Sequence, residues 1–510
     1  MDFSKRYFCS QPSNSDTETA TADCTGADDE ESASRHAPYL RHAPYLRHAP
    51  YSPGVFGGVA RIVFSPEVVV SRMADDEQST TENADAASLS PEELHERIQR
   101  REEVHLLDVR NRDEVEAWRI TGEGVDATQV TYAEFAAAKA RGEVGEFAAD
   151  LDLREPVVAV CPRGEVSATV AELLREEGLD ARNLDSGMEG WARVYVAREV
   201  PTTDSAAAAD SVTVADSTTA ADPAATAAPA ADPTVVQYDR PASGCLAYLV
   251  VSGDEAAVID PLRAFADRYV ADAEEFGAQL RYAIDTHVHA DHVSGVRRLA
   301  AEEGAHAVLP AGARERGLAD DLDATLVGDG DEIRVGDATL TALHAPGHTT
   351  ELTALRLGGA SGSIESESVR DGGLLFSGDA LFTDSFGRPD LERGDEGARD
   401  LAGTLYDTLT EKLLALPDET LVAPGHRTPE AAPNPDENDT FTARLGAVDD
   451  RLRIPDEKGA FVDRVLESLP PRPANYDEII PVNLGRESLD DEAAFEVELG
   501  PNNCAVAAMD

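Results

Sequence analysis

Lysine is nearly absent from this sequence of 510 residues. Only four of its 44 basic residues are lysines, against 98 acidic residues, and the formal net charge is −54. A field of this sign repels the phosphates of nucleic acids and anionic lipids, so we expect no nucleic-acid partner. An acidic, lysine-poor surface is typical of proteins in molar salt, where the Debye length falls to about 3 Å. We therefore expect a halophilic protein that needs salt to stay compact.

Cysteine and long apolar runs are also scarce. The five cysteines include no C-x-x-C pair, which argues against a disulfide framework and predicts reduced thiols. No run reaches the eighteen or so apolar residues that a membrane span needs, and the N-terminus lacks the pattern of a secretory signal. The sequence predicts a cytoplasmic protein with no membrane partner, and it is compatible with a homo-oligomer.

Two low-complexity segments divide the chain. Residues 35–51 repeat the unit Arg-His-Ala-Pro-Tyr-Leu, whose prolines are incompatible with helices and central strands. We expect residues 1–88 to form a disordered extension, with Met73 as a candidate start of translation. Residues 200–233 are mainly Ala, Thr, Asp, Ser and Pro, too poor in large apolar groups to offset their ordering entropy. The sequence thus predicts ordered domains at 89–199 and 234–510, joined by a linker.

The first ordered region alternates buried strands with helices. Ser90-Pro91-Glu92-Glu93 offers an N-cap serine, a proline at the first helical position and a glutamate three residues after the cap. Apolar runs at 104–109 and 156–160 predict buried strands, and residues 165–177 have a helical pattern. This alternation is typical of an α/β domain with a parallel sheet covered on both faces.

A cysteine loop follows the second of these strands. Cys161 opens the sequence Cys-Pro-Arg-Gly-Glu-Val-Ser, which leads into the predicted helix. At a helix N-terminus, unpaired backbone N–H groups and the positive end of the helix dipole stabilise an anion on sulfur. This context favours a catalytic Cys161 over a buried structural thiol.

This loop, together with Leu107-Asp108-Val109-Arg110 and residues 185–191, resembles the rhodanese sulfurtransferases. The resemblance implies that Cys161 carries sulfane sulfur as a persulfide, within a cradle of Arg163, Gly164 and Ser167. Residues 122–131 depart from the family pattern, and Val166 stands where an arginine is common. The preferred sulfur donor is therefore left open.

In the second ordered region, histidines and aspartates gather at predicted strand ends. Two histidines two residues apart at a strand end point to the same side, so both imidazoles can reach one metal. Neutral imidazole and carboxylate are ligands that divalent iron and zinc accept, and four such clusters predict a metal site. We expect Asp291 and His292 to begin a helix and to face a neighbouring site. The clusters are His287-Val288-His289-Ala290-Asp291-His292, His344-Ala345-Pro346-Gly347-His348, Ser377-Gly378-Asp379 and Ala423-Pro424-Gly425-His426.

The four clusters resemble the metallo-β-lactamase fold, an αβ/βα sandwich with metals at one edge. The segments Gly244-Cys245-Leu246-Ala247-Tyr248, Ile259-Asp260-Pro261 and Gly387-Arg388-Pro389-Asp390 are similar to the persulfide dioxygenases, particularly forms fused to rhodanese domains. This resemblance implies one Fe(II) per chain, held by His287, His348 and Asp379 as a facial triad with positions left for substrate and O2. We also expect a buried Arg388–Asp390 ion pair that steadies the metal loop.

The expected activity combines both halves. Cys161 would exchange sulfur with a small thiol, thiosulfate or sulfite, and the iron site would oxidise a low-molecular-weight thiol persulfide with O2 to sulfite. In related thioester hydrolases, which resemble glyoxalase II, a second metal site is completed by residues that here are His289, Asp291, His292 and His426. A dinuclear zinc thioester hydrolase with an attached sulfurtransferase is therefore the alternative. A non-catalytic sulfur carrier is a third hypothesis.

Overall fold

The structure is a computed structural model of the chain that describes residues 87–202, 232–358, 372–500 and 503–506. The predicted disordered extension up to residue 86 lies outside the described residues, as does most of the predicted linker, at 203–231. Among the described residues, no helix is both long and apolar enough to cross a bilayer.

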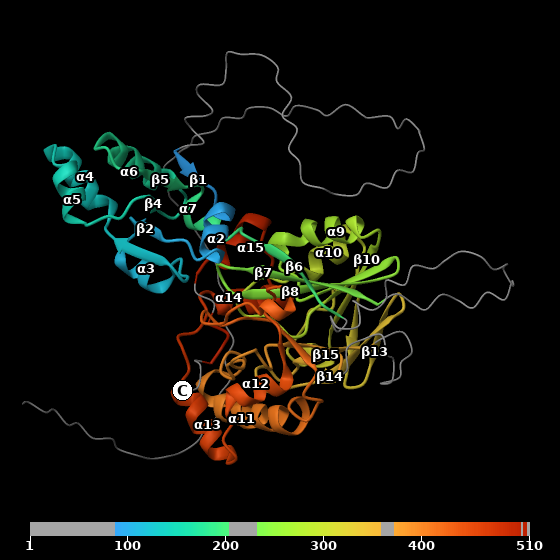
Figure 1. The fold of residues 1–510 in the computed structure, drawn as a ribbon. Coiled ribbons are helices and arrows are strands. Elements are labelled where there is room, and N and C mark those ends of the chain that lie inside the picture. Colours follow the sequence, from blue (N-terminus) through green and yellow to red (C-terminus); the bar gives the residue numbers. More distant parts are fainter. Residues whose placement is uncertain (1–86, 203–231, 359–371, 501–502, 507–510) are drawn as a thin grey trace, which may run out of the picture. The chain divides into compact units, whose positions relative to one another are not determined.

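The N-terminal domain is built on a five-stranded parallel sheet with the strand order β1-β5-β4-β2-β3, which confirms the predicted α/β fold (Figure 1). Helix α2 begins as its sequence predicts, because Ser90 Oγ accepts a hydrogen bond from the Glu93 amide at 3.1 Å. The strands are β1 (Ser88–Leu89), β2 (Val104–Asp108), β3 (Val125–Gln129), β4 (Val157–Val160) and β5 (Ala181–Leu184). The helices are α2 (Pro91–Gln99), α3 (Arg112–Ala117), α4 (Tyr132–Arg141), α5 (Val144–Asp150), α6 (Glu165–Glu176) and α7 (Gly187–Trp191).

Helices cover both faces of this sheet. On one face, Leu94 of α2 and Trp191 of α7 pack against β2 and β4. On the other face, Phe135 of α4 and the pair Val170 and Leu174 of α6 are buried in a second cluster. The spacing of four between Val170 and Leu174 places both on one side of α6, which is why the helix lies flat on the sheet.

The C-terminal domain is a sandwich of two mixed sheets. Its seven-stranded sheet also contains β6 (Val196–Val200), which pairs antiparallel with β7, so this sheet begins before the predicted linker. Strand order in that sheet is β12-β11-β10-β9-β8-β7-β6, and in the six-stranded sheet it is β13-β14-β15-β16-β17-β18. The strands are β7 (Thr234–Arg240), β8 (Cys245–Ser252), β9 (Glu255–Ile259), β10 (Gln279–Ile284), β11 (His306–Pro310), β12 (Ala324–Val327), β13 (Glu332–Val335), β14 (Ala338–His344), β15 (Thr353–Gly358), β16 (Leu374–Gly378), β17 (Leu421–Pro424) and β18 (Ala443–Arg444).

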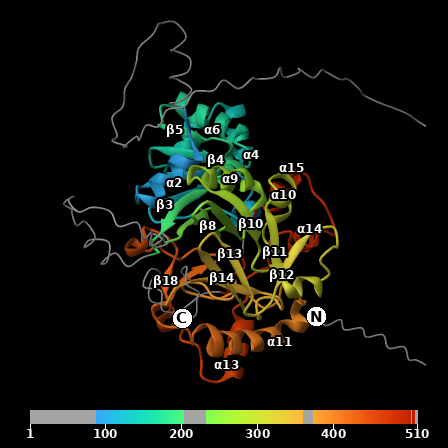
Figure 2. The ribbon, with the colours of Figure 1, turned by 90° about the vertical axis from the view of Figure 1, so that its right-hand side faces the viewer.

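Three apolar layers hold the sandwich together. The inner faces of the two sheets share one core, which includes Tyr248 of β8 and Phe376 of β16. Helices α9 and α10 cover the outer face of the seven-stranded sheet, and α11, α12 and α13 cover that of the six-stranded sheet (Figure 1 and Figure 2). The predicted αβ/βα sandwich is therefore confirmed. The helices are α9 (Ala266–Glu275), α10 (Val296–Glu302), α11 (Gly394–Asp407), α12 (Leu445–Leu452), α13 (Lys458–Glu467), α14 (Tyr476–Asn483) and α15 (Asp491–Val497).

The two sheets are joined where several strands end. Gly425, after β17, donates its amide to the carbonyl of Gly378, and its own carbonyl accepts from Leu246 of β8. The Thr353 amide of β15 donates to the carbonyl of Thr286, just after β10. The Leu246–Gly425 and Thr353–Thr286 bonds cross from one sheet to the other, and the Gly425–Gly378 bond joins the ends of two neighbouring strands. The loops that follow β10, β16 and β17 therefore meet at one edge of the sandwich.

Candidate metal centre and cysteine loop

His287, His348 and Asp379 meet at this edge although they come from three separate loops. Their ligand atoms lie within 4.8 Å of one another. Oδ2 of Asp379 is 3.9 Å from His287 Nε2 and 3.8 Å from His348 Nε2. Ligand atoms with bonds of about 2 Å to one ion lie roughly 3–4 Å apart, so one metal ion fits between these groups.

Hydrogen bonds orient both imidazoles with Nε2 toward this centre. His348 Nδ1 donates to the carbonyl of Arg388 at 2.7 Å. Thr286 Oγ1 donates to Asp260 Oδ2 at 2.9 Å, so the same hydroxyl accepts from His287 Nδ1, also at 2.9 Å. In both rings the proton is thus on Nδ1, which leaves a lone pair on Nε2 for a metal.

The centre contains buried polar atoms with no hydrogen-bond partner. His287 Nε2 and Asp379 Oδ2 are two of them. Burial lowers the pKa of His287 well below its ordinary value, with His289 and His348 adding to the effect. Burial also lowers the pKa of His348. Neutral imidazoles beside an unpartnered carboxylate oxygen are the donor set that a divalent metal requires, so these residues fit such an ion.

The segment 387–390 packs directly against the triad. A Cβ atom on Gly387 would lie 2.0 Å from the Asp379 carbonyl oxygen and 2.8 Å from His348 Nδ1, so only glycine fits there. Arg388 forms a buried two-point ion pair with Asp390, with N···O distances of 2.7 and 3.0 Å. Since the Arg388 carbonyl holds His348, this ion pair fixes the backbone that orients the His348 ring.

The other four predicted residues divide into two groups. His426 Nε2 and His292 Nδ1 lie 2.9 and 3.1 Å from Oδ2 of Asp291, and Cys245 Sγ lies 3.2 Å from the same oxygen. His289 is not part of this cluster, because its Nε2 lies 3.2 Å from Asp260 Oδ1. The structure therefore brings Asp291, His292 and His426 together with Cys245. The centroid of the His289 ring lies 4.1 Å from those of both His287 and His292.

Ion pairing stabilises the cluster around Asp291. Burial alone would raise the pKa of Asp291, but His426 and His292 hold it well below its ordinary value. Burial would likewise lower the pKa of His426, whereas Asp379 and Asp291 hold it well above. The charges of these residues thus compensate one another within the cluster.

The expectation that Asp291 and His292 begin a helix is wrong. The loop continues to residue 295, and α10 begins at Val296. Side chains from two distant segments bind the loop backbone and hold it out of helical conformation. Glu351 accepts from the Val288 amide at 2.9 Å, and Asn483 donates to the carbonyls of His289 and His292 at 3.0 and 2.9 Å.

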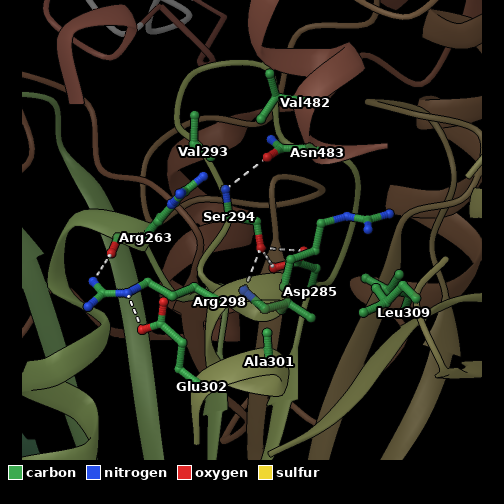
Figure 3. A pocket seen from close by; sticks show the side chains of 13 residues that line it. Arg263, Asp285, Val293, Ser294, Arg298, Ala301, Glu302, Leu309, Val482 and Asn483 are labelled. Atoms are coloured by element: carbon green, nitrogen blue, oxygen red, sulfur yellow. Dashed lines mark hydrogen bonds and ion pairs between the residues drawn. The ribbon is translucent and has the colours of Figure 1, made fainter. Parts of the chain in front are cut away.

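A pocket of about 240 Å³ lies beside this loop (Figure 3). In its wall, Ser294 Oγ donates to both oxygens of Asp285 at 2.9 and 2.7 Å, and Asn483 Oδ1 accepts from the Ser294 amide at 2.9 Å. Burial raises the pKa of Asp285 to about 6. None of the predicted metal-site residues lines this pocket, so it is separate from the metal centre.

Cys161 lies buried between the end of β4 and the start of α6. Its sulfur accepts three hydrogen bonds: from the Gly164 amide at 3.1 Å, the Ser167 amide at 3.3 Å and Ser167 Oγ at 3.1 Å. Three donors around one sulfur stabilise negative charge on it. Gly164 has a φ of +85°, a conformation that favours glycine and turns its amide toward the sulfur.

Arg163, the third predicted cradle residue, contacts carboxylates instead of the sulfur. Its side chain is 65% exposed and lies 2.5 Å from Glu189 and 3.2 Å from Glu496. The hydrogen bond with Glu189 is the largest of the effects that raise the pKa of Arg163. Of the three predicted cradle residues, Gly164 and Ser167 therefore contact the sulfur of Cys161, whereas Arg163 lies at the exposed edge of the loop.

Sequence reasoning missed several residues of the metal centre. It assigns no role to Asp260, which lies in a segment similar to the persulfide dioxygenases. Asp260 follows β9 as the predicted site residues follow their own strands, so the strand-end signal could have identified it. Glu351 lies three residues after His348, but nothing in that spacing indicates its bond to the Val288 amide. Cys504 lies within 4.8 Å of ligand atoms of Asp379 and His426, and no motif marks it.

Comparisons with known proteins agree with both halves of the structure. A family model described as the metallo-beta-lactamase superfamily matches residues 240–426, and the rhodanese-like domain model matches residues 90–194. The mitochondrial persulfide dioxygenase ETHE1 of Mus musculus is 33% identical over 193 residues, which are 37% of this chain and 66% of that protein. The hydroxyacylglutathione hydrolase GloC of Haemophilus influenzae is 31% identical over 34% of this chain and 79% of that protein.

A solved structure of ETHE1 from Myxococcus xanthus is 29% identical, with a TM-score of 0.40, and covers 49% of this chain and 97% of that chain. The chain spans about two thirds, 66%, of the length of the ETHE1 relatives from mouse, human and cattle.

Proposed function

Because the chain belongs to the metallo-beta-lactamase superfamily and contains a rhodanese-like domain as well, we propose that it is an iron-dependent persulfide dioxygenase coupled to sulfur transfer at Cys161. The observation that carries the proposal is the His287–His348–Asp379 triad, with its two oriented imidazoles and its unpartnered carboxylate oxygen. The persulfide dioxygenase relatives at 33% identity support the same assignment.

The proposed reaction is R–S–SH + O2 + H2O giving R–SH, sulfite and two protons. The terminal sulfur goes from the sulfane state to sulfite and loses four electrons, all of which O2 accepts. A thiol has no sulfane sulfur and would not be a substrate. When bound, Fe(II) would supply redox chemistry and coordination positions for the sulfur anion and O2.

The chain's own residues hold and shape that centre. His287, His348 and Asp379 would hold the metal. Thr286 and the Arg388 carbonyl keep the Nδ1 proton on each imidazole, so that Nε2 stays available. His426 binds Oδ1 of Asp379 at 2.6 Å and leaves Oδ2 facing the two histidines. These contacts fix the ligands before any substrate arrives, which lowers the cost of organising the site.

A dinuclear zinc thioester hydrolase is the second candidate. It is favoured by Asp291, His292 and His426, whose ligand atoms lie within 4.8 Å of one another and of Cys245 Sγ. The hydroxyacylglutathione hydrolase relatives support it at similar identity. In favour of sulfur oxidation are the rhodanese-like domain in the same chain and the segment Gly387-Arg388-Pro389-Asp390, which is similar to the persulfide dioxygenases.

The Cys161 loop supplies the second half of the proposal. Three donors hold its sulfur, so the thiolate and its persulfide would both be stabilised there. Two sites in one chain raise the effective concentration of a shared persulfide. Since Cys161 acts only while reduced, we place the enzyme in the cytoplasm.

The test is oxygen uptake and sulfite release with glutathione persulfide and iron-loaded protein in high salt. Asp379→Ala is expected to abolish both, and Asp337→Ala, a change at an exposed aspartate, serves as the matched control. Hydrolysis of a hydroxyacylglutathione thioester is measured in parallel. Thioester hydrolysis without oxygen uptake would replace the dioxygenase with the hydrolase.

A further inference from the structure

The exposed side chains of Arg163, Glu165 and Val166 form the rim of the Cys161 loop, and this rim is acidic and apolar. Glu165 and Val166, the first two residues of α6, are both exposed, Val166 with 36% of its surface accessible. The loop's basic residue, Arg163, is already paired with Glu189 and Glu496. Within residues 161–167, all of which the structure describes, no unpaired cation faces an incoming ligand.

This rim distinguishes between two classes of sulfur donor. Thiosulfate carries two negative charges and three sulfonate oxygens, which need a cation or several free donors at the rim. A thiol persulfide carries at most one negative charge on its terminal sulfur. Like charges repel, and Glu189 is already paired with Arg163, so the exposed Glu165 opposes a dianion more strongly than a monoanion.

The donors around the cradle lead to the same conclusion. The Gly164 and Ser167 amides and Ser167 Oγ all point at the sulfur of Cys161. They can hold one transferred sulfur atom, but their use at Sγ leaves none of them for a sulfonate group. A sulfonate would then lie against the side chain of Val166, which offers no hydrogen bond.

From these contacts, and resting on the proposed role of Cys161, we propose that the rhodanese-like domain takes sulfane sulfur from thiol persulfides and rejects thiosulfate, with Glu165 and Val166 setting the preference. The Cys161 thiolate attacks the terminal sulfur of R–S–SH. A new S–S bond forms, the donor's S–S bond breaks, and R–S⁻ leaves and takes a proton from water. The sulfane sulfur keeps its oxidation state, so no oxidant is needed.

The reverse reaction obeys the same preference. Sulfite is also a small, highly charged oxyanion, so it would be a poor acceptor for sulfur held on Cys161. Sulfite formed at the metal centre would therefore leave the enzyme as product and would not be converted to thiosulfate on this loop.

The experiment follows the added sulfur on Cys161 by intact-protein mass spectrometry, using the full chain and equal concentrations of glutathione persulfide or thiosulfate. Persulfide is expected to load Cys161 at least about ten times faster. Val166→Arg should raise the thiosulfate rate relative to the persulfide rate by about ten-fold, and Glu165→Gln should change the ratio in the same direction. Phe276→Arg adds the same charge at an exposed apolar residue of the C-terminal domain, and this control should keep the parent ratio.

Salt provides an independent readout. Added KCl screens the rim charges and should narrow the gap between the two donors. Equal loading of the parent protein by both donors, or an unchanged ratio in both Val166→Arg and Glu165→Gln, would overturn the inference. Failure of both donors to load Cys161 would instead overturn the proposed sulfur transfer at Cys161, and the inference with it.

Discussion

His426 Nδ1 lies 2.6 Å from Oδ1 of Asp379, and this bond determines which carboxylate oxygen is left for a metal. The other oxygen, Oδ2, faces His287 and His348 and has no hydrogen-bond partner. On its other side, His426 contacts Asp291 at 2.9 Å. His426 therefore connects the predicted triad to the cluster around Asp291 and positions a ligand that comes from a different strand.

Replacing His426 tests that connection. In His426→Ala, Asp379 loses the partner that fixes its orientation, so we expect iron affinity and oxygen uptake to fall by about 10–100-fold. His306→Ala, at an exposed histidine bonded to Thr325, is the control and should match the parent. Iron titration and an oxygen electrode measure both effects. Unchanged iron affinity in His426→Ala would contradict the positioning role.

Gly387 offers a second test of the candidate metal site, through its packing against Asp379 and His348. In Gly387→Ala the added methyl would lie 2.0 Å from the Asp379 carbonyl and 2.8 Å from His348 Nδ1, so both ligands must move. We expect loss of most bound metal and a lower melting temperature, measured by elemental analysis and calorimetry. Gly459→Ala, in α13 with no atom within 4 Å of the new methyl, should bind metal normally. Full metal content in Gly387→Ala would show that this packing is dispensable.

The two sites are predicted to be separable. Cys161→Ser should abolish sulfur transfer, because oxygen replaces the attacking sulfur, while oxygen consumption with preformed persulfide continues. Both reactions are measured on the same preparation. If sulfur transfer and oxygen consumption both disappear in a folded Cys161→Ser protein, the prediction that the two sites act separately is wrong.

Salt dependence follows from the net charge of −54. We expect the melting temperature to rise steeply between low and molar KCl, because salt screens the repulsion among carboxylates. Calorimetry over a series of KCl concentrations measures this effect. A melting temperature that does not change with salt would show that the acidic surface does not limit stability.

The sequence predicts the architecture well because its signals are local. Alternating apolar runs, the Ser90 cap and the cysteine between β4 and α6 each act within a few residues, and the structure has the corresponding elements. The four strand-end motifs could be recognised because the ends of neighbouring strands meet at one edge of a sandwich. The identification of both domains rests on these motifs and agrees with the family models.

The contacts between distant segments could not be predicted. The loop after β10 stays non-helical up to residue 295 because Glu351 and Asn483, far away in the sequence, bind its backbone. His289 Nε2 lies 3.2 Å from Asp260 Oδ1 and does not join the group around Asp291, although the centroid of its ring lies only 4.1 Å from that of His292. Cys504 reaches the centre from the last described segment of the chain. Such partners depend on tertiary packing, which local patterns do not encode.

The most direct test of the central claim is elemental analysis of the full chain, purified in high salt from cells supplied with both iron and zinc. The triad account predicts about one iron per chain, lost in Asp379→Ala and retained in Asp337→Ala. Two zinc ions per chain, with iron absent from active protein, would contradict it.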